Sequence, residues 1–187
     1  KGSKHGTERM EYEWDAEERL IAAAQKRNGT DVTVRTEYRY DGLGRRIQKS
    51  VINIEDSSKS YVRRFIYDGE NVIQELDGQN HIVAAYMHGP GLDAPVAMLR
   101  DHNGNGRFDD NEVFNFTKDG LGSVRELVSG GKRIEQRYRY SAYGETKVGR
   151  VVEDPMAEKF IEQPYGYADG IFEQESGDIE FGWRYYS

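Results

Sequence analysis

Residues 101–112 carry oxygen-bearing side chains at the spacing of a calcium-binding loop. Gly106 stands at position 6 of this segment, where such a loop must turn sharply, and Arg107 at position 7 can offer its backbone carbonyl. Calcium takes about six to eight hard oxygen ligands, and a glutamate in the last position can supply two of them. The side chains at positions 1, 3, 5, 9 and 12 are Asp101, Asn103, Asn105, Asp109 and Glu112. The spacing predicts an EF-hand-like loop that binds Ca²⁺ through these side chains and the Arg107 carbonyl.

The segments that flank this loop, 97–100 and 113–116, are typical of strands and not of the helices of an EF-hand. We therefore expect the loop alone, inserted between two strands. Because two early ligands are Asn and the sequence offers no partner loop, the expected dissociation constant is about 10⁻⁴–10⁻³ M, as in extracellular modules. Bound Ca²⁺ would stabilise the folded state, to which alone it binds. The alternative is an Asn/Gly-rich turn whose carboxylates coincide by chance.

Other side chains in the sequence lack the spacing of a catalytic or metal site. The chain has no Cys, which excludes disulfides, thiolate metal sites and Cys nucleophiles. Its four His residues lack the spacing of a zinc site. Ser123 lies outside the Gly-x-Ser-x-Gly motif of hydrolases and is expected to be a turn residue. We therefore predict a protein that is not an enzyme.

The composition favours strands and argues against some partners. Tyr is nearly twice as frequent as Phe (13 against 7 residues), and Val and Ile outnumber Leu, which suits a pleated, half-buried sheet. A net charge of −7 argues against binding to nucleic acid. No apolar run approaches the roughly 18 residues of a membrane span. The tyrosines could stack on sugars, but pairing across strands is the expected use.

Three segments repeat an aromatic residue followed by Asp and then by small residues. Their Asp residues are Asp15, Asp41 and Asp68, which lie 26 and 27 residues apart. Asp-Gly between alternating runs is a strong hairpin signal, because Gly accepts a positive φ and Asp caps its own turn. Apolar and polar residues alternate on both sides of Asp41. Each unit is predicted to be a strand, a turn and a second strand, and Asp119 begins a further Asp-Gly turn.

Two segments have features of helices. Residues 15–27 combine an Asp N-cap, a Glu three residues later and good helix formers, and Asn28-Gly29 follows as a stop. The repeat register instead makes this segment a hairpin, which we favour because packing between repeats can override a weak helix propensity. Asp154 followed by Pro155 predicts a short helix over 154–162.

Six short blocks along the chain contain combinations of Tyr, Asp and Gly. They are Tyr40-Asp41, Tyr67-Asp68, Tyr86–Asp93, Lys118–Arg125, Tyr140–Gly144 and 163–186. In this order the blocks resemble the Rhs/YD-repeat family, and specifically its C-terminal repeat-associated core. Two departures stand out: Gly120 replaces the usual His, and 178–180 stand where the family prefers Leu-Tyr-Tyr.

The resemblance implies an all-β fold of stacked antiparallel β-hairpins, the YD repeats, which form a curled sheet or shell segment with the calcium loop inserted. The implied organisation is YD-type hairpin repeats over 1–80 and the repeat-associated core over 81–187. In this family the shell commonly encloses a C-terminal toxin, which a downstream Asp-Pro-x-Gly motif releases by self-cleavage. Asp154-Pro155 lacks the required Gly, so no protease residues are assigned.

The sequence and the resemblance together predict a non-enzymatic, calcium-stabilised structural domain of a secreted or cell-surface protein. The expected partners are other parts of a longer Rhs/YD-repeat chain or neighbouring subunits, with neither nucleic acid nor a membrane span. Two alternatives stay open. The first is a segment of a toxin-encapsulating shell, whose partner is the toxin cargo, and the second is a carbohydrate-binding or adhesive module, or a fibre-forming subunit, whose partners include glycans.

Overall fold

The computed structural model describes residues 8–90, 94–141, 146–150, 161–172, 179–181 and 184–186, and in these ranges the chain is all-β. Every regular element described is a strand or a short 3-10 turn. No helix in these ranges is long and apolar enough to cross a membrane.

The main sheet consists of β1 (Glu8–Trp14), β2 (Leu20–Arg27), β3 (Asp31–Tyr40), β4 (Arg46–Asn53), β5 (Tyr61–Asp68), β6 (Asn71–Leu76), β7 (Ile82–His88), β8 (Pro95–Arg100), β9 (Val113–Lys118), β10 (Val124–Ser129), β11 (Ile134–Tyr140) and β12 (Thr146–Arg150). A smaller sheet contains β13 (Ile171–Phe172), β14 (Ile179–Phe181) and β15 (Arg184–Tyr186). The 3-10 turns are η1 (Ser57–Lys59), η2 (Asp110–Glu112) and η3 (Tyr167–Asp169).

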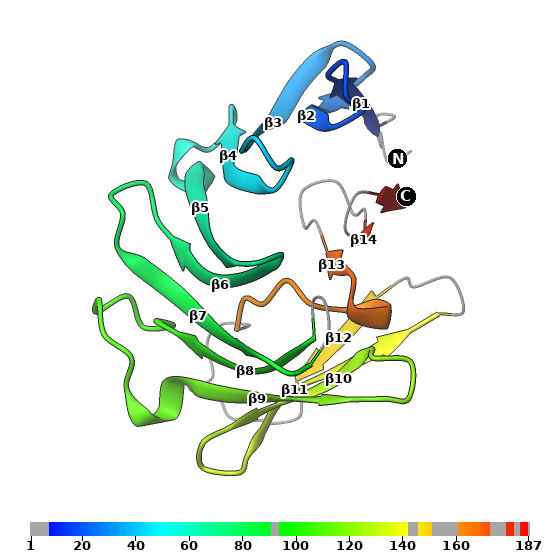
Figure 1. Cartoon of the computed structure of the whole chain (residues 1–187). Helices are drawn as coiled ribbons and strands as arrows, with labels where there is room; N and C mark the ends of the chain where they lie inside the picture. The colour runs from blue at the N-terminus through cyan, green and yellow to red at the C-terminus, as the bar shows by residue number, and fades with distance from the viewer. Residues whose placement is uncertain are drawn as a thin grey trace, which may run out of the picture.

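The strands β1 to β12 form one antiparallel meander in which each strand pairs with the next one along the chain (Figure 1). This confirms the predicted stacking of antiparallel hairpins. The predicted curling is not reached to the point of closure, because β1 and β12 stand at opposite ends of the strand order. Within the described residues the sheet is therefore an open meander, with β1 and β12 as its edge strands.

The segment 15–27 is a hairpin, as the repeat register predicted, and not a helix. A turn at 15–19 leads into β2, which pairs with β1 on one side and β3 on the other. Leu20 and Ala23 are buried there against Tyr38. Pairing outweighs the helix propensity of this segment. The strands on both sides of β2 use its backbone hydrogen bonds, and its small side chains become buried.

Two other expectations about segments have different outcomes. The helix predicted over 154–162 lies almost wholly outside the described residues. The division into domains at residue 80 stays a prediction, and the main sheet continues across that position because β6 pairs with β7.

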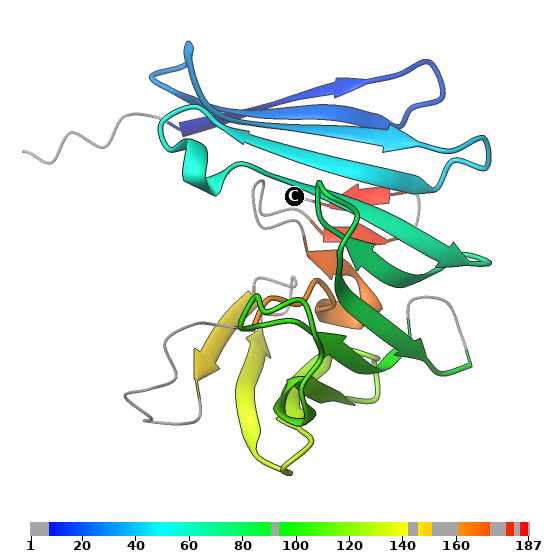
Figure 2. The same cartoon turned by 90° about the vertical axis from the view of Figure 1, so that its left-hand side faces the viewer.

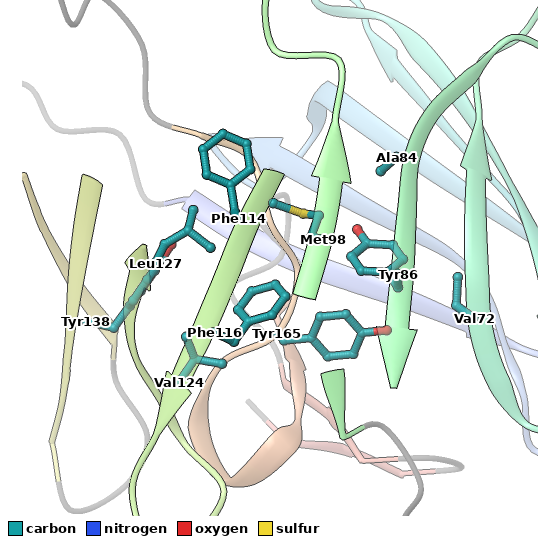
Figure 3. Packing of buried hydrophobic residues seen from close by; sticks show 10 residues of the cluster. All are labelled: Val72, Ala84, Tyr86, Met98, Phe114, Phe116, Val124, Leu127, Tyr138 and Tyr165. Carbon is teal, nitrogen blue, oxygen red and sulfur yellow. The ribbon is translucent and has the colours of Figure 1, made fainter. Parts of the chain in front are cut away.

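The larger hydrophobic core lies on the inner face of β6 to β11 (Figure 3). Cross-strand neighbours supply it, for example Tyr86 with Met98 and Met98 with Phe114. Its buried members are Val72, Ala84, Tyr86, Met98, Phe114, Phe116, Val124, Leu127, Tyr138 and Tyr165. Tyr165 comes from outside the main sheet, and its side chain is only 1% exposed.

Residues 161–171, here called the strap, return across the inner face of the main sheet (Figure 2). The strap backbone is tied to the sheet at its start and at its middle. The amide side chain of Gln136 bonds the N–H and the carbonyl of Ile161, and the Val124 N–H donates to the Gly166 carbonyl at 3.0 Å. Between these ties, the Tyr165 ring packs edge-on against Tyr86. The strap therefore closes the core from the inner side.

Candidate functional site

The hairpin turns follow one recurrent design, seen clearly at Asp41. Its Oδ1 accepts the N–H groups of Leu43 and Arg45, both at 2.9 Å. The Asp41 N–H donates to the Arg45 carbonyl at 2.9 Å, which closes the loop. Gly44 has a φ of 81°, in the left-handed region that a type I turn followed by a bulge requires. Asp at the first position therefore holds the turn through its own side chain.

The same design occurs at Asp15, Asp77 and Asp119, each of which accepts the N–H groups two and four residues later. The sequence predicted turns at Asp15 and Asp119 but missed the one at Asp77. The signal was present, because Asp77-Gly78 has the composition of a turn and Asn80, with a φ of 70°, replaces the glycine. Asp68 begins a tighter turn, in which it pairs directly with Asn71.

These hydrogen bonds lower the pKa of the turn carboxylates. For Asp41, partial desolvation raises the pKa, but the Arg45 side chain and the backbone N–H groups outweigh it, and the pKa lies below its ordinary value. Asp15 behaves in the same way beside Arg19. For Asp77 the backbone N–H of His81 is the largest cause of the lowered pKa. The folded turn therefore prefers the ionised carboxylate.

Tyrosines tie each hairpin to the hairpin before it. The Tyr40 hydroxyl, at the end of β3, donates to the Leu20 carbonyl at the start of β2, at 2.7 Å. The Tyr67 hydroxyl donates in the same way to the Arg46 carbonyl at 2.8 Å. The Tyr140 hydroxyl donates to the Val124 carbonyl at 2.6 Å. Each of these hydrogen bonds runs from a ring at the end of an odd-numbered strand to a carbonyl near the start of the preceding even-numbered strand. We call such a hydrogen bond a joint.

Arginines cover the rings of the joints. The guanidinium carbon of Arg19 lies 5.2 Å from the centre of the Tyr40 ring, and that of Arg45 lies 5.0 Å from the centre of the Tyr67 ring. Arg45 also forms an ion pair with Asp41 at 2.7 Å. One turn carboxylate thus orients an arginine over the tyrosine of the next hairpin, a cation–π contact worth about 0.5–2 kcal/mol. This explains physically why Tyr and Asp recur together.

A buried polar cluster, which sequence reasoning missed, lies under the strap. Glu75 and Arg100 form an ion pair at 2.9 Å, and both side chains are nearly inaccessible to solvent. The Tyr86 hydroxyl donates to Glu75 at 2.5 Å. Glu162 of the strap lies 3.3 Å from both Arg63 and Arg100. The partners come from β5, β6, β7, β8 and the strap, so no local sequence pattern could reveal them.

The predicted calcium ligands at the two ends of 101–112 are held by backbone hydrogen bonds within the loop. The Asp101 carboxylate accepts the N–H groups of Gly104, Asn105 and Gly106 at 2.7–3.0 Å. The Glu112 side chain, only 2% exposed, accepts the N–H groups of residues 102, 103 and 109 at 2.8–3.0 Å. The strands predicted on both sides are confirmed as β8 and β9.

The remaining predicted ligands bond to one another. Asn103 and Asn105 each donate a side-chain N–H to the same oxygen of Asp109, at 3.2 and 3.0 Å. The backbone N–H of Arg107 donates to the Asn105 side-chain oxygen. In the described residues, no group of three or more His, Cys, Asp or Glu side chains is arranged to hold a metal ion. The loop brings the predicted residues together, and Ca²⁺ binding stays a prediction.

The comparison with family models found no match. Among curated proteins, the chain is 27% identical to the "tRNA3(Ser)-specific nuclease WapA" of Bacillus spizizenii and 26% identical to the "tRNA nuclease WapA" of Bacillus subtilis, over 99% of its length in both cases. The chain spans only 7% of the length of these relatives.

Solved structures share the fold. The chain resembles the crystal structure of TcdB2-TccC3 with a TM-score of 0.65 and 18% identity, and the Photorhabdus luminescens Tc holotoxin pore with a TM-score of 0.64 and 17% identity. Each match covers 95% of this chain and 8% of the other. These comparisons confirm the resemblance that the Tyr-Asp blocks predicted: the chain is similar to a segment of Rhs/YD-repeat proteins.

Proposed function

We propose that this chain is a non-catalytic wall segment of a longer, extracellular Rhs/YD-repeat protein, and that the wall encloses a toxin cargo. The observation that carries the proposal is the series of joints, which tie one hairpin to the next through Tyr40, Tyr67 and Tyr140. The match to 8% of TcdB2-TccC3 supports it, because a short piece of a large structure is what a wall segment would be.

The joints suit a wall for a physical reason. Ladder hydrogen bonds alone allow a meander to fray where strands diverge near the turns, and each joint adds a hydrogen bond across that gap. The tyrosines are therefore used inside the sheet, with Tyr38, Tyr86, Tyr138 and Tyr165 buried in the cores. This leaves fewer rings for stacking on sugars, so a carbohydrate-binding module has less support than the wall.

Protease protection in the full-length parent protein tests the cargo proposal. Limited proteolysis is expected to spare the region C-terminal to this segment in the wild type. Tyr67→Ala, which removes a joint and its ring, should make that region sensitive. Leu43→Ala at an exposed turn tip serves as the control. A parent gene that ends near Ser187, or a downstream region digested equally in all three proteins, would refute the proposal.

Two measurements distinguish the wall from a carbohydrate-binding module and from a fibre subunit. A carbohydrate module should show glycan binding on an array and by calorimetry. A fibre subunit needs open sheet edges that pair between copies, and hence concentration-dependent association. A flat glycan response and monomeric behaviour at high concentration would leave the wall as the supported function.

We propose in addition that Ca²⁺ binds at 101–112 and stabilises this loop. The support is the ligand spacing together with Gly106, whose φ of 77° provides the sharp turn at position 6. The test compares melting with millimolar calcium and with chelator, for the wild type and for Asp101→Ala combined with Glu112→Gln. Calcium is expected to raise the melting temperature of the wild type only. Equal melting temperatures under all conditions would remove the calcium proposal and leave the wall untouched.

A further inference from the structure

The chain contains three Asn-Gly steps, a pair of residues prone to spontaneous chemistry. Asparagine is thermolabile in proteins. The backbone nitrogen of the next residue can attack its side-chain carbonyl carbon, and glycine has no side chain to obstruct that attack. One step lies in the turn between β2 and β3 and two lie in the loop 101–112; they are Asn28-Gly29, Asn103-Gly104 and Asn105-Gly106. Whether a step reacts depends on whether its amide group and its glycine nitrogen are free to meet.

In the loop 101–112 the attacking nitrogens are held. The Gly104 N–H donates to one oxygen of the Asp101 carboxylate at 2.7 Å, and the Gly106 N–H donates to the other at 2.8 Å. A backbone nitrogen must give up its hydrogen before it attacks, and the nearby carboxylate disfavours the anion that results. Asp101 therefore keeps both glycine nitrogens in their unreactive form.

The asparagine amides of this loop are held as well. The side-chain oxygen of Asn103 accepts the Asn105 N–H at 2.9 Å, and that of Asn105 accepts the Arg107 N–H at 2.8 Å. Both side-chain NH₂ groups donate to Asp109. Several hydrogen bonds would have to break together before either amide could turn toward its glycine.

The Asn28 step lacks these restraints. Asn28 and Gly29 are both exposed. Within the described part of the chain, neither the Asn28 side chain nor the Gly29 N–H takes part in a hydrogen bond. A Cβ placed on Gly29 would meet no atom within 4 Å, so the space beside the attacking nitrogen is open.

The turn that contains Asn28 is held by little. Asn28 and Gly29 have φ of 55° and 78°, as a two-residue type I′ turn requires. Ring closure needs rotation about the Asn28 Cα–C bond, and hence a local opening of this turn. One backbone hydrogen bond spans it, from the Thr30 N–H to the Arg27 carbonyl at 3.3 Å, which is long for such a bond. Hairpin tips with exposed backbone hydrogen bonds open at low free energy.

We infer that Asn28 is a modification site, at which the chain deamidates spontaneously through a cyclic imide. The Gly29 nitrogen, having lost its proton to hydroxide, forms a bond to the Asn28 side-chain carbonyl carbon. The bond from that carbon to the amide nitrogen then breaks, and ammonia leaves after taking a proton from water. Water opens the ring at one of its two carbonyl carbons, which yields aspartate or isoaspartate. In total, the amide and one water become a carboxylate and an ammonium ion.

The product changes the tip of the β2–β3 hairpin. A carboxylate at position 28 adds a negative charge next to Arg27, which forms an ion pair with Glu55 at 2.6 Å. Isoaspartate also adds one carbon atom to the backbone, which a two-residue type I′ turn does not accommodate. The modified hairpin tip is therefore expected to loosen. This inference rests on neither the cargo nor Ca²⁺.

The test is incubation of the 187-residue chain at mildly alkaline pH with chelator present, followed by peptide mapping and mass spectrometry. Asn28 is expected to convert at least about tenfold faster than Asn103 and Asn105, because several hydrogen bonds must break first at those two steps. Asn28→Gln is the control, since the larger ring that glutamine needs closes far more slowly. Asp101→Ala is expected to raise the rates at 103 and 105 and to leave the rate at 28 unchanged. Equal wild-type rates at the three steps, or no gain at 103 and 105 in Asp101→Ala, would overturn the inference.

The unfolded wild-type chain supplies a reference that needs no variant. In guanidinium chloride the three steps consist of the same two residue types, and they are expected to convert at similar rates. Folding should slow Asn103 and Asn105 at least about tenfold and should slow Asn28 by clearly less. A folded chain in which Asn28 is slowed as much as Asn103 would show that the turn protects it, and the inference would fall.

Discussion

At the scale of single residues, the ion pair between Glu75 and Arg100 has the strongest consequences. Both side chains are buried, the Tyr86 hydroxyl donates to Glu75, and Glu162 lies 3.3 Å from Arg100. The Nε atom of Arg100 has no hydrogen-bond partner among the described residues. Desolvation raises the pKa of Glu75, but Arg100 outweighs it, and the pKa is lowered. The pair is therefore charged in the folded protein. A buried pair of this kind contributes little net stability when intact but is costly to break, because either charge alone would be stranded.

We expect Arg100→Met to lower the free energy of unfolding by about 3–5 kcal/mol, because it leaves Glu75 charged and buried. Arg100→Met combined with Glu75→Leu is expected to recover much of this loss. Urea denaturation of the two single variants and of the double variant measures the coupling. Additive losses in the double variant would mean that the two charges do not depend on one another.

At the scale of the elements, the repeating unit of this sheet is a hairpin held by two kinds of contact. An Asp turn fixes the loop within the hairpin, and a joint fixes the hairpin to its predecessor. Arg45 connects an Asp turn with a joint, because it forms an ion pair with Asp41 and covers the Tyr67 ring. The Tyr-Asp repeat is thus a structural unit that spans two neighbouring hairpins.

The Asp turns predict loss of stability in acid. The pKa values of Asp15, Asp41 and Asp77 are lowered from an ordinary value of 3.8. Their contribution is therefore present above about pH 4 and is lost as pH falls through the lowered values. Asp77→Asn should flatten the acid limb of the stability profile relative to the wild type. Identical profiles for Asp77→Asn and the wild type, measured by urea denaturation across this pH range, would argue against the turn carboxylates as the cause.

Removal of a single joint hydroxyl gives a direct measure of the joint. Tyr67→Phe keeps the ring under Arg45 but removes the hydroxyl that donates to the Arg46 carbonyl. The expected loss in the free energy of unfolding is about 0.5–1.5 kcal/mol. Tyr40→Phe should behave alike, because its hydroxyl makes the equivalent bond. No loss in either variant, by chemical denaturation, would show that the joints do not stabilise the isolated segment.

At the scale of the whole molecule, the strap decides how the open sheet buries its inner face. Tyr165 reaches Tyr86 on β7 and Phe116 on β9, while Glu162 reaches Arg63 on β5. One short segment near the C-terminus therefore contacts strands from much of the meander. A sheet open at both ends cannot bury one of its faces by itself and needs such a cover.

Tyr165→Ala is expected to lower the free energy of unfolding by about 3–5 kcal/mol, the usual cost of deleting a large buried aromatic side chain. Tyr167→Ala is the matched control, because its half-buried ring packs on Tyr140 and not inside the core. Thermal and urea unfolding measure both variants. Equal losses would mean that Tyr165 has no special place in the core.

Much of the architecture could be read from local sequence. Alternation around Asp41 and the Asp-Gly turns predicted antiparallel hairpins, and the repeat register correctly made 15–27 a hairpin. These features depend on side-chain period and turn chemistry, which act over a few residues. The spacing of the predicted ligands in 101–112 is also a local feature of the sequence. The structure gathers these residues into one loop, and binding of Ca²⁺ is still to be tested.

The sequence by itself determined the units, namely the turns, the strand periodicity and the Tyr-Asp steps, because each of these is settled by neighbours in the chain. Only the tertiary structure decided what the units contact. It placed Glu162 against Arg63 and Arg100, 99 and 62 residues away in the chain. It also placed the His88 ring against the Val72 carbonyl, 16 residues away in the chain. Such contacts follow from strand order and from the return of the strap, and their sequence separation gives them no periodic signal.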